Sequence, residues 1–556
     1  MFSEDSLGPV VIETTSASPA QRTGKQGNGN KHSGLLVSVL GLASVTLLLF
    51  YFIIRNLALL DTAYRPLDRV ASILLLLSEV YISIQGIGYY IQVSQSLRTT
   101  NIARDNCLAK LAMPTVAVYI ATYNEPASVI EETAMAVSLL CYPNLAIYLN
   151  CDHQSAEQAA VVAAIAERHH LHFLHRVPNT GYKAGGINAM IERIGYDLPD
   201  ADFLCIFDAD SIPLPTFLSE IVPYFNRDPR IAYVQAPQHY GNRDASLVAD
   251  ASGHQQATFA QFISEGKQQS EAMFYCGTNV VFRVDALRDI GGLLIESITE
   301  DFNTSIKLHA RGWKSHYCNT AYVTGMGPTT LQAYWTQQSR WALGNLESFR
   351  MSFGAIFWKP GLKLLQRWEY FLSGTYFLVG WNTFLSILLP CLFLLFGIRP
   401  LIMSPIIYIV AYLPHFAVSN CFFFITMGQR GFRPRVLFLA QCLTFITFPV
   451  FMSAAVAAAL RRKEAFAVTP KGSGETALPW SAFLPHITMM TLLVIAIMAG
   501  SIQFVATQNL SVLVNIAWCA YHLALLSTFV LFNQQGTDVL ERSSSFDAIA
   551  RKASLL

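Results

Sequence analysis

The stretch FLCIFDADSIP, residues 203–213, decides the fold of this chain. Apolar residues typical of a buried strand run directly into Asp208 and Asp210, and Pro213 ends the strand. Both carboxylates are therefore predicted at the carboxyl end of a strand. Such a pair can hold a hard divalent cation that completes its shell with water and substrate phosphates. A solvated acidic turn is the plain alternative for so short a motif.

Composition places this stretch in a membrane protein. Of 556 residues, 53% are hydrophobic and only 13% are charged, and the mean hydropathy is +0.37. The net charge of +1 creates no field that would favour nucleic acid. The ten cysteines are scattered without a C-x-x-C pair, so neither a disulfide framework nor a zinc site is indicated.

Apolar runs predict two membrane spans before a soluble domain and four after it. The predicted order is a disordered cytosolic tail (1–33), two transmembrane helices (34–100), an α/β domain (113–345), interfacial helices (346–370), four transmembrane helices (371–532) and a cytosolic tail (533–556). Segment 436–458 has basic residues on both flanks, so we interpret it as interfacial or re-entrant rather than as a seventh span. This assignment puts the soluble domain and both termini in the cytoplasm. Glu79, inside the second span, should face protein or a polar cavity.

Strand-like and helical runs alternate in the soluble domain, which predicts a mainly parallel sheet covered by helices on both faces. Ligands gather at the carboxyl ends of the strands in such sheets. Those ends read Thr122-Tyr123-Asn124-Glu125, Cys151-Asp152-His153 and Asp208-Ala209-Asp210. We expect the three ends to line one cleft.

Two glycine-containing motifs follow these strand ends. In NTGYKAGGINAMI (179–191), Gly185 and Gly186 allow close backbone approach at a helix start, where free amides favour an anion, and Lys183 adds a positive charge. A plain glycine turn is the alternative. The motif YCGTN (275–279) lies in a predicted loop whose small residues leave room for a ligand.

Two further motifs belong to helices. Thr299 is a good N-cap residue for the helix that starts at TED, where acids suit the first turn. The functional alternative is that Asp301 is a general base toward a hydroxyl nucleophile. In QQSRW, Gln337, Arg340 and Trp341 share one helix face, where Arg suits a phosphate and Trp suits a sugar ring. An Arg-Trp pair at a membrane interface is the alternative.

Taken in order, the motifs TYNE, KAGGIN, DAD, YCGTN, TED and QQSRW resemble those of the processive, membrane-embedded family 2 glycosyltransferases, in particular cellulose synthases and related β-glucan synthases. Segment FAVTPK (466–471), within a predicted loop at 461–475, resembles the gating loop of cellulose synthases. The resemblance implies a multi-pass α-helical membrane protein with a cytosolic α/β GT-A (Rossmann-like) domain. It also implies Mg²⁺ or Mn²⁺ as the cofactor.

The resemblance implies a role for each motif. Uridine and the nucleotide side would be held by Tyr123, Glu125, Asp152 and Lys183. The diphosphate and its metal would be positioned by Asp208 and Asp210, with Gln337 and Arg340 on the diphosphate. The acceptor sugar would lie on Trp341 beside Cys276 and Gly277, and Asp301 would deprotonate its hydroxyl. The gating loop would close over the nucleotide through Phe466, Val468, Thr469 and Lys471.

The expected function is an inverting, processive β-glucan synthase of the plasma (inner) membrane that uses UDP-glucose, secretes the growing β-glucan and contacts membrane lipids. Curdlan-like and mixed-linkage products stay open, because QQSRW carries a second Gln and Cys151 precedes the single strand-end acid Asp152. Accessory secretion subunits or a homo-oligomer are possible partners. The alternatives are a hyaluronan- or chitin-type synthase, a lipid-linked single-sugar transferase, and a channel with a nucleotide-sensing domain.

Overall fold

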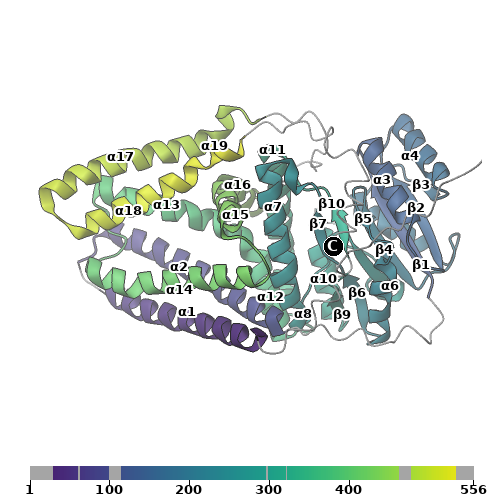
Figure 1. The fold of residues 1–556 in the computed structure, drawn as a ribbon, viewed down its shortest axis with the longest axis horizontal. Helices are drawn as coiled ribbons and strands as arrows, with labels where there is room; N and C mark the ends of the chain where they lie inside the picture. The colour runs from purple at the N-terminus through teal and green to yellow at the C-terminus, as the bar shows by residue number, and fades with distance from the viewer. Residues whose placement is uncertain are drawn as a thin grey trace, which may run out of the picture.

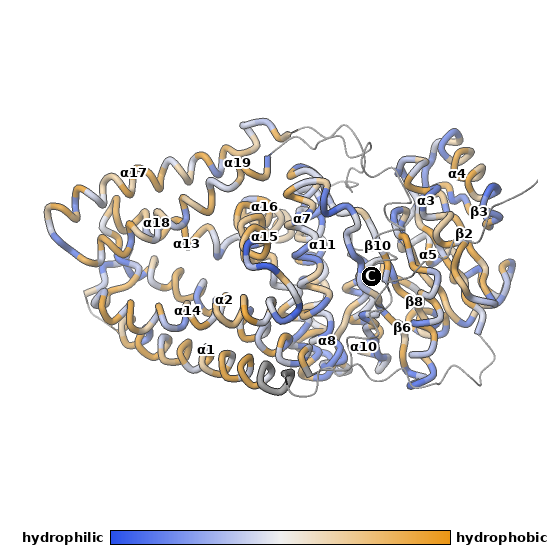
Figure 2. Tube along the Cα trace, viewed as in Figure 1, coloured by the Kyte–Doolittle hydropathy of each residue, from blue (hydrophilic) through white to orange (hydrophobic). Residues whose placement is uncertain are grey.

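The computed structural model describes residues 29–60, 63–98, 114–295, 299–320, 322–462 and 477–533. A soluble α/β domain and a bundle of long helices lie one after the other along the long axis of the molecule (Figure 1). The long helices α1, α14 and α17 are apolar along most of their length, whereas apolar residues of the soluble domain concentrate on its strands (Figure 2). This contrast agrees with the membrane part and the soluble part predicted from composition.

The soluble domain is built on a seven-stranded sheet of order β3-β2-β1-β4-β8-β6-β9. The strands in that order are β3 (His172–His175), β2 (Leu145–Cys151), β1 (Val116–Thr122), β4 (Phe203–Asp208), β8 (Val280–Arg283), β6 (Ile231–Gln235) and β9 (Lys314–Tyr317). Neighbouring strands run parallel except at β8, which is antiparallel to both β4 and β6. The predicted mainly parallel sheet is confirmed.

Both faces of this sheet are buried, as the apolar runs of its strands require. Val118 and Ile120 of β1 join one core, and Ala117 and Tyr119 join the other. The first core is covered by α3 (Ala127–Ser138), α4 (Ala156–Arg168) and α6 (Phe217–Ile221). The second is covered by α5 (Tyr182–Arg193), α9 (Val284–Ile290) and α10 (Glu300–Ala310).

A small sheet of order β5-β10-β7 closes one end of the domain. It consists of β5 (Ile212–Pro213), β10 (Val323–Gly325) and β7 (Gln238–Tyr240). Because β5 begins two residues after Asp210, this sheet fixes the chain immediately beyond the DAD motif. The Met326 amide, which follows β10, donates a hydrogen bond of 3.1 Å to Asp210 Oδ2.

Four helices connect the soluble domain to the membrane part. They are α7 (Leu247–Thr258), α8 (Glu265–Gln269), α11 (Leu331–Phe357) and α12 (Leu364–Thr375), with one π-helical turn, Phe259–Ser264, between α7 and α8. Helix α11 continues without a break past residue 345, so the predicted domain limit there falls inside a helix.

In the described part of the chain, six helices are long and apolar enough to cross a membrane. These candidate spans are Gly34–Leu59 in α1 (Gly29–Leu59), Pro66–Leu97 in α2 (Pro66–Arg98), Leu364–Phe396 in α12 and α13 (Val379–Phe396), Pro405–Gln429 in α14, Trp480–Thr507 with α17 (Leu484–Thr507), and Leu510–Phe532 with α18 (Leu510–Ser527) and α19 (Phe529–Phe532). The sequence also predicts six such helices, although the third begins at Leu364, within the segment 346–370 that is expected to be interfacial. The chain is a membrane protein.

Segment 436–458 forms two helices, α15 (Pro434–Ile446) and α16 (Phe448–Ala459), bent by 44° at their junction. The pair packs against α7 and α11 of the connecting layer, and Figure 1 shows it almost end-on, across the direction of the long helices. A broken helix in this position suits the interfacial or re-entrant assignment, which we keep as a proposal.

Candidate active site

Three polar strand ends meet at one edge of the large sheet. Thr122 of β1 lies opposite Cys151 of β2, and Ala121 lies opposite Asp208 of β4. Tyr123 and Asp152, the residues that follow β1 and β2, therefore lie at the same edge of the sheet as Asp208. The predicted convergence of these strand ends is confirmed. We call this edge of the sheet, which carries the candidate nucleotide residues, the strand-end shelf.

Asp152 is held by an arginine that the sequence analysis missed. Arg176 donates from Nε to Asp152 Oδ1 at 3.1 Å and from Nη2 to Oδ2 at 2.9 Å. It also donates to the carbonyls of Thr180 and Tyr182, so it binds the second strand end to the KAGGIN segment. Arg176 directly follows β3, so the rule that selected the other strand ends also points to it.

The outer part of the shelf is open. Tyr123 is 39% exposed, and its ring centroid lies 5.6 Å from that of His153. Glu125 Oε2 accepts a hydrogen bond of 2.8 Å from the Tyr123 amide, which fixes the TYNE turn. An exposed aromatic ring beside turn-fixed carboxylates suits a flat, hydrogen-bonding base.

Lys183 links the nucleotide edge to the YCGTN loop. Its ammonium group forms an ion pair with Asp208 and donates to the Gly277 carbonyl at 2.7 Å. The Asp208 amide donates to Thr278 Oγ1 at 2.9 Å, so two separate contacts hold the strand end against this loop. The loop lies between α8 and β8, as predicted.

The glycines of KAGGIN serve packing rather than anion binding. Helix α5 begins at Tyr182, and the Gly185 amide already donates a hydrogen bond of 2.8 Å to the Gly181 carbonyl. A side chain at Gly186 would collide with the Tyr119 hydroxyl, and its Cβ would lie 3.2 Å from Asp152 Oδ2. The prediction of free amides at these glycines is wrong, because the helix starts three residues earlier than Gly185.

Asp208 and Asp210 differ in exposure. The Asp208 side chain is 39% exposed beside Lys183, whereas Asp210 is buried and accepts from the Met326 amide. Among the described residues, no three His, Cys, Asp or Glu side chains group as a metal centre. The donors nevertheless fit a hard cation, because the carboxylate of Asp208 already holds the positive charge of Lys183. A cation bound here would need oxygen atoms from a ligand to complete its shell.

The TED motif opens α10 as predicted, and the Asp301 Oδ1 atom accepts from the Phe302 amide at 2.8 Å. Glu300 and Asp301 keep some contact with solvent, but the protein packed around them raises the pKa of both carboxyls. The charge of Asp301 raises the pKa of Glu300 further, while Lys183 and Arg340 oppose the rise of the Asp301 pKa. Asp301 is thus a carboxyl whose pKa is shifted toward the range of a general base.

Thr299 does not cap α10 with its side chain. Its hydroxyl lies 2.9 Å from Ser348 Oγ on α11, and Asn303 Nδ2 donates to the same oxygen at 3.1 Å. A Cβ at Gly344 would lie 3.0 Å from Thr299 Oγ1, so a larger residue at this position would crowd the Thr299 hydroxyl. Thr299 lies at the predicted N-cap position, but its hydroxyl joins α10 to the QQSRW helix instead of capping α10.

The QQSRW residues lie on α11, and Tyr240 of β7 brings them near the DAD motif. Burial raises the pKa of Tyr240 to about 12, and the charge of Asp210 adds to this rise. A hydrogen bond from Gln337 and the charge of Arg340 oppose it. Gln337, Arg340 and Asp210 thus all act on the pKa of one phenol. No sequence motif marks Tyr240.

Trp341 of α11 and Cys276 of the YCGTN loop are the candidate acceptor-side residues. Trp341 is partly buried and packs on the cluster that contains Phe451 of α16. The Cys276 amide donates a hydrogen bond of 3.0 Å to Gln235 Oε1. Burial raises the pKa of the Cys276 thiol, and the charge of Asp301 raises it further. The position of a Cβ at Gly277 lies 3.8 Å from Asp301 Oδ2. The loop and the candidate base are therefore in contact.

The candidate gating-loop residues Phe466, Val468, Thr469 and Lys471 lie outside the described residues. Their role stays a prediction.

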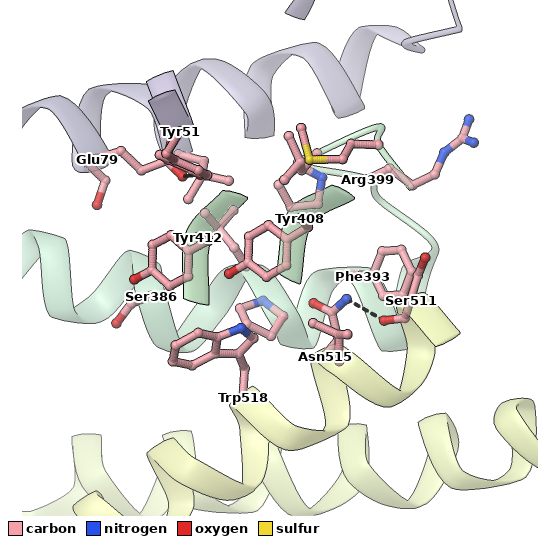
Figure 3. Close-up of a pocket in the computed structure, with 18 of the residues that line it drawn as sticks. Tyr51, Glu79, Ser386, Phe393, Arg399, Tyr408, Tyr412, Ser511, Asn515 and Trp518 are labelled. Carbon is pink, nitrogen blue, oxygen red and sulfur yellow. Dashed lines mark hydrogen bonds between the residues drawn. The ribbon is translucent and has the colours of Figure 1, made fainter. Parts of the chain in front are cut away.

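A separate cavity of about 450 Å³ lies inside the membrane part. Its wall includes Tyr51 of α1, Glu79 of α2, and Tyr408 and Tyr412 of α14, which stack with centroids 5.4 Å apart, and Trp518 of α18 faces them (Figure 3). Glu79 Oε2 pairs with Arg55 Nε at 3.1 Å. The prediction that Glu79 faces protein or a cavity rather than lipid is confirmed.

Residues 114–344 match the family described as glycosyltransferase like family 2, and residues 288–427 match the family described as cellulose synthase. The first match covers the whole soluble domain, from β1 to the middle of α11. The soluble domain is a family 2 glycosyltransferase domain.

Individual relatives extend this resemblance into the membrane part. This chain is 25% identical to a UDP-forming cellulose synthase catalytic subunit of Pseudomonas fluorescens over 480 residues, or 84% of this chain and 62% of that protein. A UDP-forming cellulose synthase catalytic subunit of Xanthomonas axonopodis is 32% identical over 273 residues, or 48% of this chain and 36% of that protein. The chain thus spans less than two thirds of the length of these relatives.

A solved structure has the same fold as the glycosyltransferase domain. A mannosyltransferase from Pyrobaculum calidifontis, solved in complex with GDP-Man and Mn²⁺, aligns with a TM-score of 0.50 at 16% identity over 71% of this chain and 100% of that one. This similarity confirms the predicted GT-A fold.

Proposed function

We propose that this chain is an inverting, processive β-glucan synthase that transfers glucose from UDP-glucose to a growing β-glucan and passes the polymer across the membrane. The observation that carries the proposal is the meeting of three groups at the YCGTN loop. Lys183 joins Asp208 to the Gly277 carbonyl, and Asp301 lies close to Gly277. A leaving-group site and a base thus lie near one small-residue loop.

In the proposed reaction, the hydroxyl of the terminal sugar attacks the anomeric carbon of UDP-glucose as the bond to the diphosphate breaks. Asp301 takes the hydroxyl proton, and the departing UDP carries the electron pair of the broken bond. Arg340 and Lys183 stabilise the negative charge that develops on the diphosphate. One displacement inverts the anomeric configuration, so no covalent enzyme intermediate forms.

The metal in this proposal is Mg²⁺ or Mn²⁺, which Asp208 and Asp210 would hold. The mannosyltransferase of the same fold was solved with Mn²⁺ and a nucleotide sugar, which supports a divalent cation here. When bound, the cation would neutralise charge on the diphosphate. Lys183 would then leave Asp208 and turn to the phosphate oxygens, a short movement because its ammonium already lies at that carboxylate.

On the nucleotide side, Tyr123, Glu125 and Asp152 would hold the uridine, with Arg176 fixing Asp152. On the acceptor side, Trp341 would stack on the terminal sugar beside Cys276. Gln337 would contact the diphosphate, and the loop with Phe466, Val468, Thr469 and Lys471 would close over the nucleotide.

The membrane cavity suits the last part of the polymer path. Its wall includes Arg399 and Asn509, which lie in the turns that follow α13 and α17, at the ends of those helices away from the glycosyltransferase domain. Tyr408, Tyr412 and Trp518 present aromatic faces of the kind that pack on sugar rings. We assign this end to the outside of the plasma (inner) membrane, with the glycosyltransferase domain in the cytoplasm.

The decisive experiment offers the purified protein, in lipid nanodiscs, radiolabelled UDP-glucose, UDP-GlcNAc or UDP-glucuronic acid with Mg²⁺ or Mn²⁺. We expect polymer from UDP-glucose alone, and digestion with linkage-specific glucanases to give its linkage. Polymer from UDP-GlcNAc with none from UDP-glucose would contradict the proposed donor. Transfer of a single sugar to a lipid extract would contradict processive synthesis.

A further inference from the structure

Three consecutive residues of the short helix α8 contact three different helices of the membrane part. Glu265 accepts from Arg430 Nη2, just after α14, at 2.7 Å. A Cβ at Gly266 would lie 2.6 Å from Gln92 Cα, so the backbones of α8 and α2 touch there. Lys267 pairs with Glu369 of α12. Helix α8 therefore contacts α2, the middle of α12 and the residue that follows α14.

The Lys267–Glu369 ion pair is the most deeply buried of these contacts. Lys267 Nζ lies 2.9 Å from Glu369 Oε2, and the two side chains are only 3% and 1% exposed. Gln92 Nε2 donates to the same Glu369 oxygen at 2.7 Å, and Lys267 also donates to Ser373 Oγ at 2.7 Å. Both charges are thus hydrogen-bonded, which a buried pair requires if it is to be tolerated.

From this pair, two short routes lead to the candidate acceptor site. Lys267 Nζ lies 5.7 Å from the ring centroid of Phe274, which directly precedes the YCGTN loop. Tyr370, next to Glu369, packs edge-on against Phe302 with centroids 5.3 Å apart, and Phe302 directly follows Asp301. Glu369 is thus linked through Lys267 to the residue that precedes the acceptor loop, and its neighbour Tyr370 contacts the residue that follows the candidate base.

We propose that Lys267 and Glu369 are positioning residues that fix the acceptor loop (YCGTN, 275–279) and Asp301 relative to the span Leu364–Phe396. In this way they keep the growing chain aligned between successive transfers. This inference rests on the proposed polymerase function. The pair touches neither the strand-end shelf nor the candidate leaving-group residues. Its loss should therefore shorten the product without weakening nucleotide binding.

An ion pair suits this task better than apolar contact. Apolar side chains pack in several similar arrangements, whereas two buried charges and their hydrogen-bond partners are satisfied in one. Replacing both charges by apolar residues of similar size commonly leaves a protein folded, whereas removing one charge leaves the other buried without its counter-charge. The double substitution therefore tests positioning separately from folding.

The test compares Lys267→Met/Glu369→Leu with the wild type in nanodiscs. We expect the KM for UDP-glucose to stay within twofold and the median product length to fall at least fivefold. The swapped pair Lys267→Glu/Glu369→Lys should recover part of that length. The control is Arg193→Met/Asp197→Leu, which removes an exposed pair on the far side of the domain and should leave product length unchanged.

A second measurement does not depend on polymer formation. Amide hydrogen exchange at residues 275–279 should speed up at least fivefold in the Lys267→Met/Glu369→Leu variant, while exchange in β1 and β4 stays at the wild-type rate. Unchanged exchange at the loop, or a wild-type product length, would overturn the positioning role. A wild type that makes no polymer would instead overturn the proposed function, and the exchange result would still decide the role of the pair.

Discussion

The strand-end shelf and the start of α10 both present carboxylates to the candidate site, but the groups around these carboxylates differ. On the shelf, Asp152 and Asp208 each have a cationic partner, Arg176 and Lys183. At the start of α10, protein packing around Asp301 raises the pKa of its carboxyl. The shelf carboxylates are ion-paired, whereas the pKa of the Asp301 carboxyl is raised. In the proposed reaction, the leaving group and the proton would therefore be handled by two different regions.

Asp301→Asn should have the largest effect, because it removes the proton acceptor while keeping the shape of the side chain. We expect polymer formation to fall by about 1,000-fold or more, at the upper part of the general-base range. UDP affinity, measured by calorimetry, should stay within about threefold, since Asp301 is not on the shelf. Retained polymerisation would refute the base assignment.

The same substitution has a predicted signature in pH. The raised pKa means that folded Asp301 keeps a proton that the unfolded chain has already lost. Its contribution to stability is present below the unfolded pKa and is lost as the pH rises through the folded pKa. The melting temperature of Asp301→Asn should therefore rise relative to the wild type over that interval. The wild-type rate should fall as the pH drops through the folded pKa, and Lys183→Gln should move this fall to higher pH, because Lys183 favours the ionised carboxyl.

Arg340→Leu should have the next largest effect. Arg340 stands between the two regions, since its charge acts on both Asp301 and Tyr240. Removing a donor that stabilises developing charge should lower kcat by about 100- to 1,000-fold. The KM for UDP-glucose should change much less, which initial-rate kinetics will show. Equal losses of affinity for UDP and of kcat would place Arg340 on the shelf instead.

Arg176→Met should affect binding rather than chemistry. Asp152 would lose both of its hydrogen bonds from Arg176, and such charge-assisted bonds contribute about 1.5–3 kcal/mol. We expect the KM for UDP-glucose to rise by about 10- to 100-fold with kcat largely retained. Lys at this position should recover only part of the affinity, because it cannot form the bidentate contact. A fall in kcat without a change in KM would contradict the assignment of the shelf to the nucleotide.

The sequence predicted the shelf better than the acceptor side, for a physical reason. Strand ends can be located by their apolar runs, and parallel pairing then forces Tyr123, Asp152 and Asp208 to one edge. Arg176 obeys the same rule. By contrast, Tyr240 and Ser348 reach the site through tertiary packing of a small sheet and a long helix, which local pattern does not encode. The Thr299 hydroxyl was misassigned for that reason, because its partner is 49 residues away.

Ser348→Ala should give the smallest effect and tests how rigidly α10 is held. Ser348 Oγ contacts both Thr299 and Asn303, whereas Ser352, one turn later on α11, donates only to Asn303, at 2.6 Å. Losing the buried Ser348 hydroxyl should cost about 1–3 kcal/mol of stability and lower kcat several-fold, since Thr299 lies two residues before Asp301. Ser352→Ala is the matched control, and it should lower the melting temperature with a smaller change in kcat. If both variants reduce kcat equally, the hydroxyls stabilise the helix pair without positioning the base, and the acceptor region is less rigid than the strand-end shelf.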